Sequence, residues 1–156
     1  MAEFRSSIEI AASPGTVFEY LTTPAGMTAW MGQYADLDPQ PGGTFAVDIA
    51  GYPIRGRYLH VEPPARVVVS WGMAGSEALP AGASTVEFRL TAVDGGTRVD
   101  LTHSGLPETA VAGHADGWQH FLPRLAAAAP GGSAGPDHWH PTGGERRRPA
   151  SKENTP

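Results

Sequence analysis

Two histidines and one tyrosine are the side chains of this sequence best suited to acid–base chemistry. His103 continues the alternation of Val99 and Leu101, so it should point inward at the end of a strand. His60 should share a face with Tyr58 on another strand. An imidazole titrates near neutral pH and can also hydrogen-bond a polar group of a ligand. A histidine that is hydrogen-bonded within the fold is the simpler interpretation, so these residues are weak catalytic candidates.

Large aromatic and sulfur-containing side chains could line an apolar pocket. Trp30 and Trp71 occupy positions expected to point inward, and Trp118 lies in the last segment with helical spacing. Methionine adds an adaptable surface to such a site, and the positions concerned are Met27, Met31 and Met73. These residues either line a pocket for an apolar ligand or fill an ordinary core. The pattern alone favours the core.

The remaining histidines are not spaced as metal ligands. His114 and His120 are separated by about 240° around a helix axis, so they cannot bind one ion together. His138 and His140 flank Trp139, but a flexible segment would lack the further ligands that a metal needs. The chain has no cysteine, no nucleophile elbow and no phosphate-binding glycine loop. We therefore expect no metal and no cofactor.

Two helix starts follow the first strand in quick succession. Residues 4–10 alternate as a strand. Ser13 and Thr23 are each followed by proline, which is typical of an N-cap and the first helical position. The spacing predicts helices over residues 14–21 and 24–31.

A long series of strands comes next, separated by Gly and Pro turns. The alternating segments are residues 34–38, 44–49, 52–62, 67–73, 85–91 and 97–104. Alternation of apolar and polar residues predicts an antiparallel sheet with one face covered and one face wet. The pattern therefore indicates an α+β fold.

The last helical segment should cover this sheet. It runs over residues 108–129, and its apolar stripe is Trp118, Phe121, Leu122 and Leu125. Gly113 and Gly117 lower the helix propensity, and Pro123 removes a backbone donor. We expect a helix that is kinked or broken near residues 119–123.

The chain length of 156 residues suits one domain. We place this domain at residues 1–129. Residues 130–156 are rich in Pro and Gly and have almost no aliphatic side chains, so they are predicted to be a disordered tail. The basic run at 145–148 could touch an anionic partner, although a solvated tail is the simpler interpretation.

Composition excludes several classes of partner. The net charge of −5 argues against nucleic acid. No apolar run is long enough for a transmembrane helix, and the N-terminus lacks the features of a signal peptide. The absence of cysteine fits a reducing compartment. We expect a cytoplasmic protein without membrane insertion.

Five collinear segments together resemble one family, over roughly residues 4–126. They are ASPGTVFEYLTTPAGMTAWMG, PGGTF, RGRYLHVEPPARVVVSW, GGTRVDLTHSGLP and GWQHFLPRL. This set is similar to the activator of heat-shock protein 90 ATPase homologue family of the START/Bet v 1-like (SRPBCC) superfamily. Pro123 within the final helix departs from the usual family pattern.

The resemblance implies a helix-grip fold, in which a curved antiparallel sheet of about six to seven strands wraps on a long C-terminal helix. It also implies a cavity between sheet and helix that takes apolar molecules. With the inward-facing positions, it predicts a lining of Met27, Trp30, Met31, Phe45, Val47, Tyr58, Val69, Trp71, Met73, Phe88, His103, Trp118, Phe121 and Leu122.

Three functions stay open. The first is binding of a small apolar or amphipathic ligand, such as a lipid, an aromatic or a polyketide-like compound, by a monomer or weak homodimer. The second is a cyclase, dehydratase or hydrolase acting on an aromatic or polyketide-like substrate, with His103, His60 and Tyr58 as acid–base candidates. The third, which the resemblance alone suggests, is interaction with a chaperone or regulator.

Overall fold

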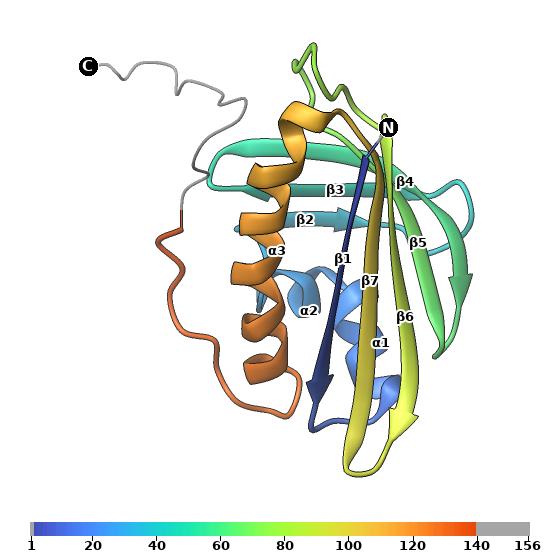
Figure 1. Ribbon diagram of the computed structural model, residues 1–156. Coiled ribbons are helices and arrows are strands. Elements are labelled where there is room, and N and C mark those ends of the chain that lie inside the picture. Colours follow the sequence, from blue (N-terminus) through green and yellow to red (C-terminus); the bar gives the residue numbers. More distant parts are fainter. Residues whose placement is uncertain (1, 140–156) are drawn as a thin grey trace.

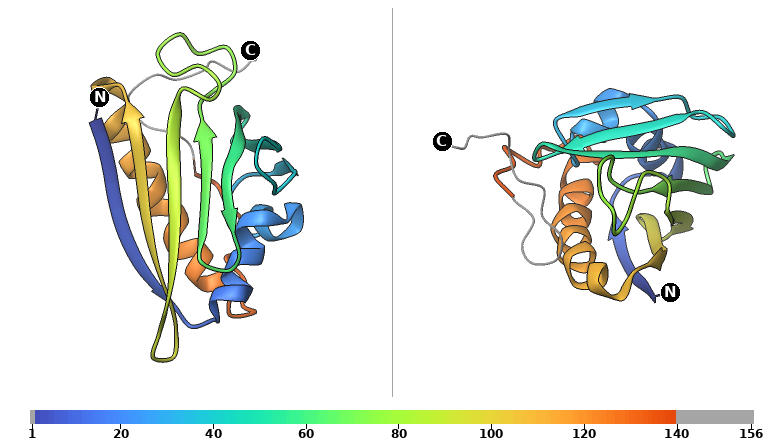
Figure 2. Two further views of the ribbon diagram at one scale, coloured as in Figure 1. Left: turned by 90° about the vertical axis from the view of Figure 1, so that its right-hand side faces the viewer. Right: turned by 90° about the horizontal axis from the view of Figure 1, so that it is seen from above.

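One antiparallel sheet of seven strands curves around a long helix in the computed structural model, which describes residues 2–139 (Figure 1; Figure 2). The strand order is β1-β7-β6-β5-β4-β3-β2. The elements are β1 (Ala2–Ile10), α1 (Pro14–Thr22), α2 (Pro24–Thr28), β2 (Tyr34–Leu37), β3 (Thr44–Ile49), β4 (Tyr52–Glu62), β5 (Arg66–Trp71), β6 (Ser84–Val93), β7 (Gly96–Leu106) and α3 (Glu108–Ala128). The predicted α+β helix-grip architecture is confirmed.

The two short helices begin where the hydroxyl–proline pairs predict. Ser13 is extended, and its Oγ accepts a hydrogen bond from the backbone N–H of Thr16 at 3.3 Å. Thr23 caps α2 in the same way, with Gly26 N–H as donor at 3.0 Å. The second helix ends at Thr28, earlier than the predicted residue 31, and a tight turn carries the chain on to Met31.

The alternation of the central strands places one apolar face against α3. Val86 and Phe88 on β6 lie opposite His103 and Leu101 on β7, and all four side chains are buried. The intervening outward-facing residues form ion pairs, of which the closest joins Arg66 to Glu87. The predicted sheet, covered on one face and wet on the other, is therefore present.

A β-bulge in β4 overturns one prediction from this alternation. Tyr58 pairs with Val69 and His60 with Val68, so the pairing shifts by one residue at Leu59. The extra residue reverses the alternation. Tyr58 is fully buried whereas His60 is exposed. The expectation that these two side chains share a face is wrong.

The long helix α3 is continuous through Pro123, so the predicted break near residues 119–123 does not occur (Figure 1). Pro123 and Gln119 both lie on the exposed side of the helix. The carbonyl that loses its intrahelical donor can therefore be hydrated. On the opposite side, Phe121, Leu122 and Leu125 are buried and hold the helix on the sheet.

The segment after α3 differs from the predicted tail. Residues 130–139 turn back and lie alongside α3, where Arg124 and Asp137 make defined contacts (Figure 1). Composition describes the average tendency of a segment and does not register a few specific side-chain contacts. The rest of the predicted tail, residues 140–156 with the basic run at 145–148, lies outside the described residues. The domain boundary near residue 129 stays a prediction.

Replacement of Pro123 by alanine should raise the free energy of unfolding by up to about 3 kcal/mol, because it restores a backbone donor without removing a buried side chain. Urea denaturation followed by circular dichroism measures the change. Pro130→Ala, just past the helix, is the matched control and should have little effect. A destabilised Pro123→Ala variant would contradict this account of the helix.

Candidate functional site

A cavity of about 140 Å³ lies between α3 and the strands β3, β4 and β5. Its lining is predominantly apolar. The residues that line it are Met31, Ile49, Tyr52, Ile54, Trp71, Gly72, Met73, Ser76, Ala78, Leu79, Thr109, Ala110, Gly113, His114, Gly117, Trp118, Phe121 and Trp139.

Aromatic side chains form the floor of this cavity. The rings of Trp71 on β5 and Trp118 on α3 are 5.2 Å apart between centroids, and Phe88 meets Trp118 edge-on at 5.9 Å. Such pairs contribute about 0.5–1.5 kcal/mol each beyond the burial of their area. Trp71 and Trp118 both line the cavity and offer ring faces and edges to a ligand, while Phe88 packs behind Trp118 in the core.

His114 is the titratable side chain in the cavity wall that carries a perturbed pKa. Its Nδ1–H donates to the carbonyl of Ala110 at 2.9 Å, and its Nε2 accepts from Trp71 Nε1–H at 3.3 Å. Burial lowers the pKa of His114, although the bond to Ala110 acts in the opposite direction. The ring is therefore neutral at pH 7, and Nε2 is an acceptor at the cavity wall.

His103 lies behind the cavity, in a fully bonded position. Ser84 donates its hydroxyl proton to the carbonyl of Trp71 at 2.7 Å, so its Oγ accepts from His103 Nε2–H at 2.8 Å. His103 Nδ1 accepts from Trp118 Nε1–H at 3.0 Å. Burial, with a smaller contribution from His114, lowers the pKa of His103 to about 2.

The predicted lining residues divide into two groups. Those that reach the cavity are Met31, Trp71, Met73, Trp118 and Phe121. The others are buried in the core and do not line the cavity, namely Met27, Trp30, Phe45, Val47, Tyr58, Val69, Phe88, His103 and Leu122. The difference arises because the cavity lies toward one end of α3, while the predicted set follows the whole inner face.

The three acid–base candidates are not brought together at the cavity. Tyr58 donates its hydroxyl to the carbonyl of Leu21 at 2.9 Å, and burial raises the pKa of this phenol. His60 is exposed on the outside of the bulge, and His103 is enclosed by its partners. None of the three lines the cavity.

Sequence reasoning missed several residues of the wall. His114 precedes Trp118 by four positions, so the apolar stripe could have been extended by one helical turn to find it. Gly113 and Gly117 weaken the helix, yet both form part of the wall, where a side chain would take up space. Trp139 carries no sequence signal, because its position depends on how the chain folds back.

The part of the chain that the structure describes contains no cluster of three or more His, Asp or Glu side chains able to hold a metal ion. His114 faces the cavity and His120 faces the returning C-terminal segment, as their spacing predicts. His138 is exposed, and His140 lies outside the described residues. Within residues 2–139, no helix is long and apolar enough to cross a membrane.

The buried His103 should make stability depend on pH. Its folded pKa of about 2 lies below its ordinary value of 6.5, so the unfolded chain binds more protons between these values. The contribution of neutral His103 to the free energy of unfolding is fully present above about pH 6.5, and it decreases as the pH falls below this value. Each such histidine contributes a slope approaching about 1.4 kcal/mol per pH unit below its unfolded pKa.

His103→Gln removes the titration, while its amide can still donate to Ser84 and accept from Trp118. Urea denaturation of this variant between pH 7 and 5 should show a shallower loss of stability than the wild type. The exposed control His138→Gln should retain the full slope. Equal slopes for His103→Gln and wild type would show that His103 does not titrate on unfolding as described.

Solved structures similar to this chain share its architecture. An AHSA1-like protein from Rhizobium etli is 40% identical, with 94% of this chain and 93% of that chain covered and a TM-score of 0.71. The Aha1 dimer from Colwellia psychrerythraea is 25% identical, with coverage of 83% and 96% and a TM-score of 0.73. DynU16, described as a protein in the dynemicin biosynthetic locus, is 26% identical, with coverage of 85% and 48% and a TM-score of 0.73.

Comparison of the sequence with family models assigns the chain to a family. No curated protein matches the chain. Residues 11–129 match the family described as Activator of Hsp90 ATPase homolog 1-like protein. This span includes α1, α2, the whole sheet except β1, and α3. The chain therefore belongs to the Activator of Hsp90 ATPase homolog 1-like family, with the START/Bet v 1-like fold that its sequence pattern predicts.

Proposed function

We propose that the protein binds a small apolar or amphipathic ligand in the cavity between α3 and the sheet. The observation that carries this proposal is the cavity of about 140 Å³ with three tryptophans and a phenylalanine in its wall. An unfilled apolar space leaves its lining without contact partners on one side. A ligand of matching shape restores those contacts.

The volume sets the scale of the ligand. An apolar cavity of about 150 Å³ in another protein takes up benzene. A cavity of about 140 Å³ is therefore suited to a single aromatic ring or a short aliphatic chain. Larger members of the expected classes, such as lipids and multi-ring polyketides, exceed this volume.

His114 gives the proposed ligand a polar anchor. The hydrogen bond that its Nε2 accepts from Trp71 is long, at 3.3 Å, so a ligand hydroxyl can compete as a donor. The pKa of His114 is lowered by burial, which keeps this nitrogen an acceptor. A phenol-like ligand satisfies both the apolar wall and this acceptor.

The structural neighbours support the same ligand class. DynU16 is described as belonging to a biosynthetic locus for dynemicin, and it shares the fold at 26% identity. The similarity favours an aromatic or polyketide-like ligand for this chain. The alternative of a cyclase, dehydratase or hydrolase has no candidate among His103, His60 and Tyr58 at the cavity wall.

Two further expectations belong to this proposal. The Colwellia psychrerythraea relative is described as a dimer, which supports a weak homodimer as one state of this chain. The absence of cysteine supports a cytoplasmic location. A chaperone or regulator partner rests on the family description alone.

Ala110→Phe should abolish ligand binding by filling the cavity from α3, where Ala110 lines the wall. The measurement is titration with p-cresol, followed by tryptophan fluorescence and by calorimetry. Wild type should show saturable binding and a change in the emission of Trp71 and Trp118, because both rings border the ligand.

Ala112→Phe is the matched control, since Ala112 is exposed on the same helix. It adds the same side chain and should leave binding intact. Unchanged binding by Ala110→Phe would place the ligand elsewhere. Absence of binding by the wild type across single-ring aromatics, short fatty acids and fused-ring phenols would refute the proposed function.

A further inference from the structure

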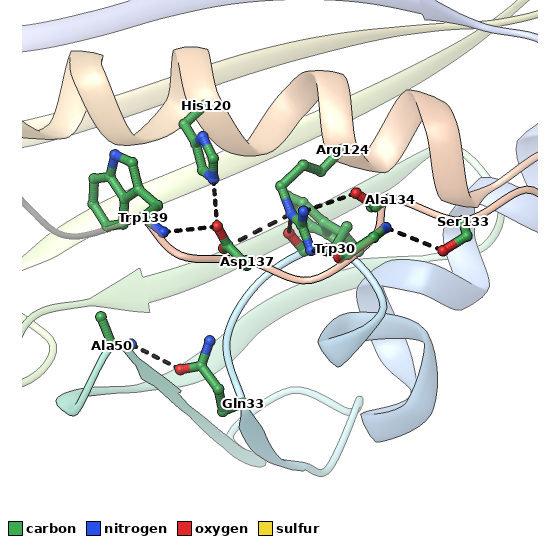
Figure 3. Close-up of polar contacts among 10 residues, drawn as sticks. Trp30, Gln33, Ala50, His120, Arg124, Ser133, Ala134, Asp137 and Trp139 are labelled. Atoms are coloured by element: carbon green, nitrogen blue, oxygen red, sulfur yellow. Dashed lines mark hydrogen bonds and ion pairs between the residues drawn. The ribbon is translucent and has the colours of Figure 1, made fainter.

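The chain after α3 forms a strap, residues 130–139, that runs back alongside the helix (Figure 1; Figure 3). Arg124 holds its middle, because Nη1 donates to the carbonyl of Ala134 and Nη2 to that of Gly135, each at 3.0 Å. The N–H of Gly135 donates to Ser133 Oγ at 3.0 Å. In the described part of the chain, the strap is thus fastened mainly through side chains and adds no strand to the sheet.

Asp137 fixes the strap next to α3. Its Oδ1 accepts from His120 Nε2 at 2.8 Å and from the backbone N–H of Trp139 at 3.1 Å (Figure 3). Its Oδ2 lies 3.8 Å from Arg124 Nε. Only 11% of the Asp137 side chain is exposed. A carboxylate so enclosed must keep its partners, so it determines where the strap sits.

Trp139 is placed on the helix by these contacts. Its ring stacks on His120 with centroids 5.6 Å apart and an angle of 16° between planes, and meets Phe121 edge-on at 5.1 Å. The indole lies over Gly117, where an added Cβ would be 3.6 Å from it. A Cβ at this distance would be in ordinary van der Waals contact with the indole, whereas a larger side chain at Gly117 would compete for the space that the indole occupies.

Trp139 also lines the cavity, and it is the lining residue that the strap contributes. The family match ends at residue 129, so the strap lies beyond it. The rest of the wall is held through backbone hydrogen bonds and core packing, in the strands and α3 and also in the loop over residues 72–79, where the N–H of Met73 donates to the carbonyl of Leu79 at 2.9 Å. The indole can leave without breaking either.

We propose that Trp139 is a removable wall that sets the size of ligand the cavity accepts, with Asp137 as its latch. With the indole in place, the space of about 140 Å³ suits a single ring. With the indole withdrawn, the cavity opens along Gly117 and Phe121 and admits a ligand of several rings. This inference rests on the proposed binding function, and it states which sizes of ligand the cavity accepts within the proposed ligand class.

The test is calorimetric titration of the full chain and of Trp139→Ala with p-cresol, 2-naphthol and 1-hydroxypyrene. Wild type should prefer p-cresol. Trp139→Ala should bind p-cresol about tenfold more weakly, the loss expected for one aromatic contact. It should bind 2-naphthol and 1-hydroxypyrene at least tenfold more tightly than wild type does.

His138→Ala is the matched control, because His138 is exposed beside the indole and should leave all three affinities unchanged. If wild type binds p-cresol and Trp139→Ala keeps the same order of preference, the wall role is wrong and the proposed function stands. If neither chain binds any of the three phenols, the proposed function fails and the inference fails with it. Binding of the larger phenols by Trp139→Ala alone supports the inference.

Asp137→Asn tests the latch with Trp139 still present. The amide can accept from the N–H of Trp139, but the charge facing Arg124 and His120 is gone. The preference should shift toward the larger phenols by less than in Trp139→Ala. Nuclear magnetic resonance of the Trp139 indole and the His120 ring should show partial loss of their stacking. A strap that loosens with no change in preference would overturn the role of the latch.

Discussion

A chain of hydrogen bonds through the apolar core fixes α3 against the sheet. Trp118 on α3 donates to His103 on β7, His103 donates to Ser84 on β6, and Ser84 donates to the carbonyl of Trp71 on β5. A rotation or slide of α3 would strand one of these buried groups, at a cost of about 1–3 kcal/mol. Apolar packing tolerates several helix orientations, whereas this series of hydrogen bonds selects one. It thereby decides which face of α3 borders the cavity.

The same constraint accounts for the chemistry of the site. Because His103 is fully hydrogen-bonded in the core, the imidazole that borders the cavity is that of His114, which lies one turn before Trp118 on α3. The two rings lie 4.9 Å apart, edge to face. Both are neutral, since burial lowers the pKa of each. The site therefore presents hydrogen-bonding capacity without charge, which suits an uncharged ligand better than an ionic one.

Most of the fold could be predicted because its signals are local. The caps at Ser13 and Thr23 and the alternation of β6 and β7 act over a few residues, and the structure reproduces them. The site could be predicted only in part. The position of His60 depends on a bulge set by pairing with β5, and that of Trp139 depends on contacts with a helix that ends before the strap begins. Composition and periodicity give no information on either the pairing of β4 with β5 or the contacts of Trp139 with α3.

Arg124 makes a third hydrogen bond, which connects the strap to the turn after α2. Its Nε donates to the carbonyl of Trp30 at 3.2 Å, just before Met31 enters the cavity wall (Figure 3). One guanidinium therefore joins α3, the strap and the turn after α2. Met31 and Trp139, which both line the cavity, lie in the two segments that share this fastening, so the local unfolding of these segments is thermodynamically coupled. Whatever loosens one side lowers the protection of backbone amides from hydrogen exchange at the other.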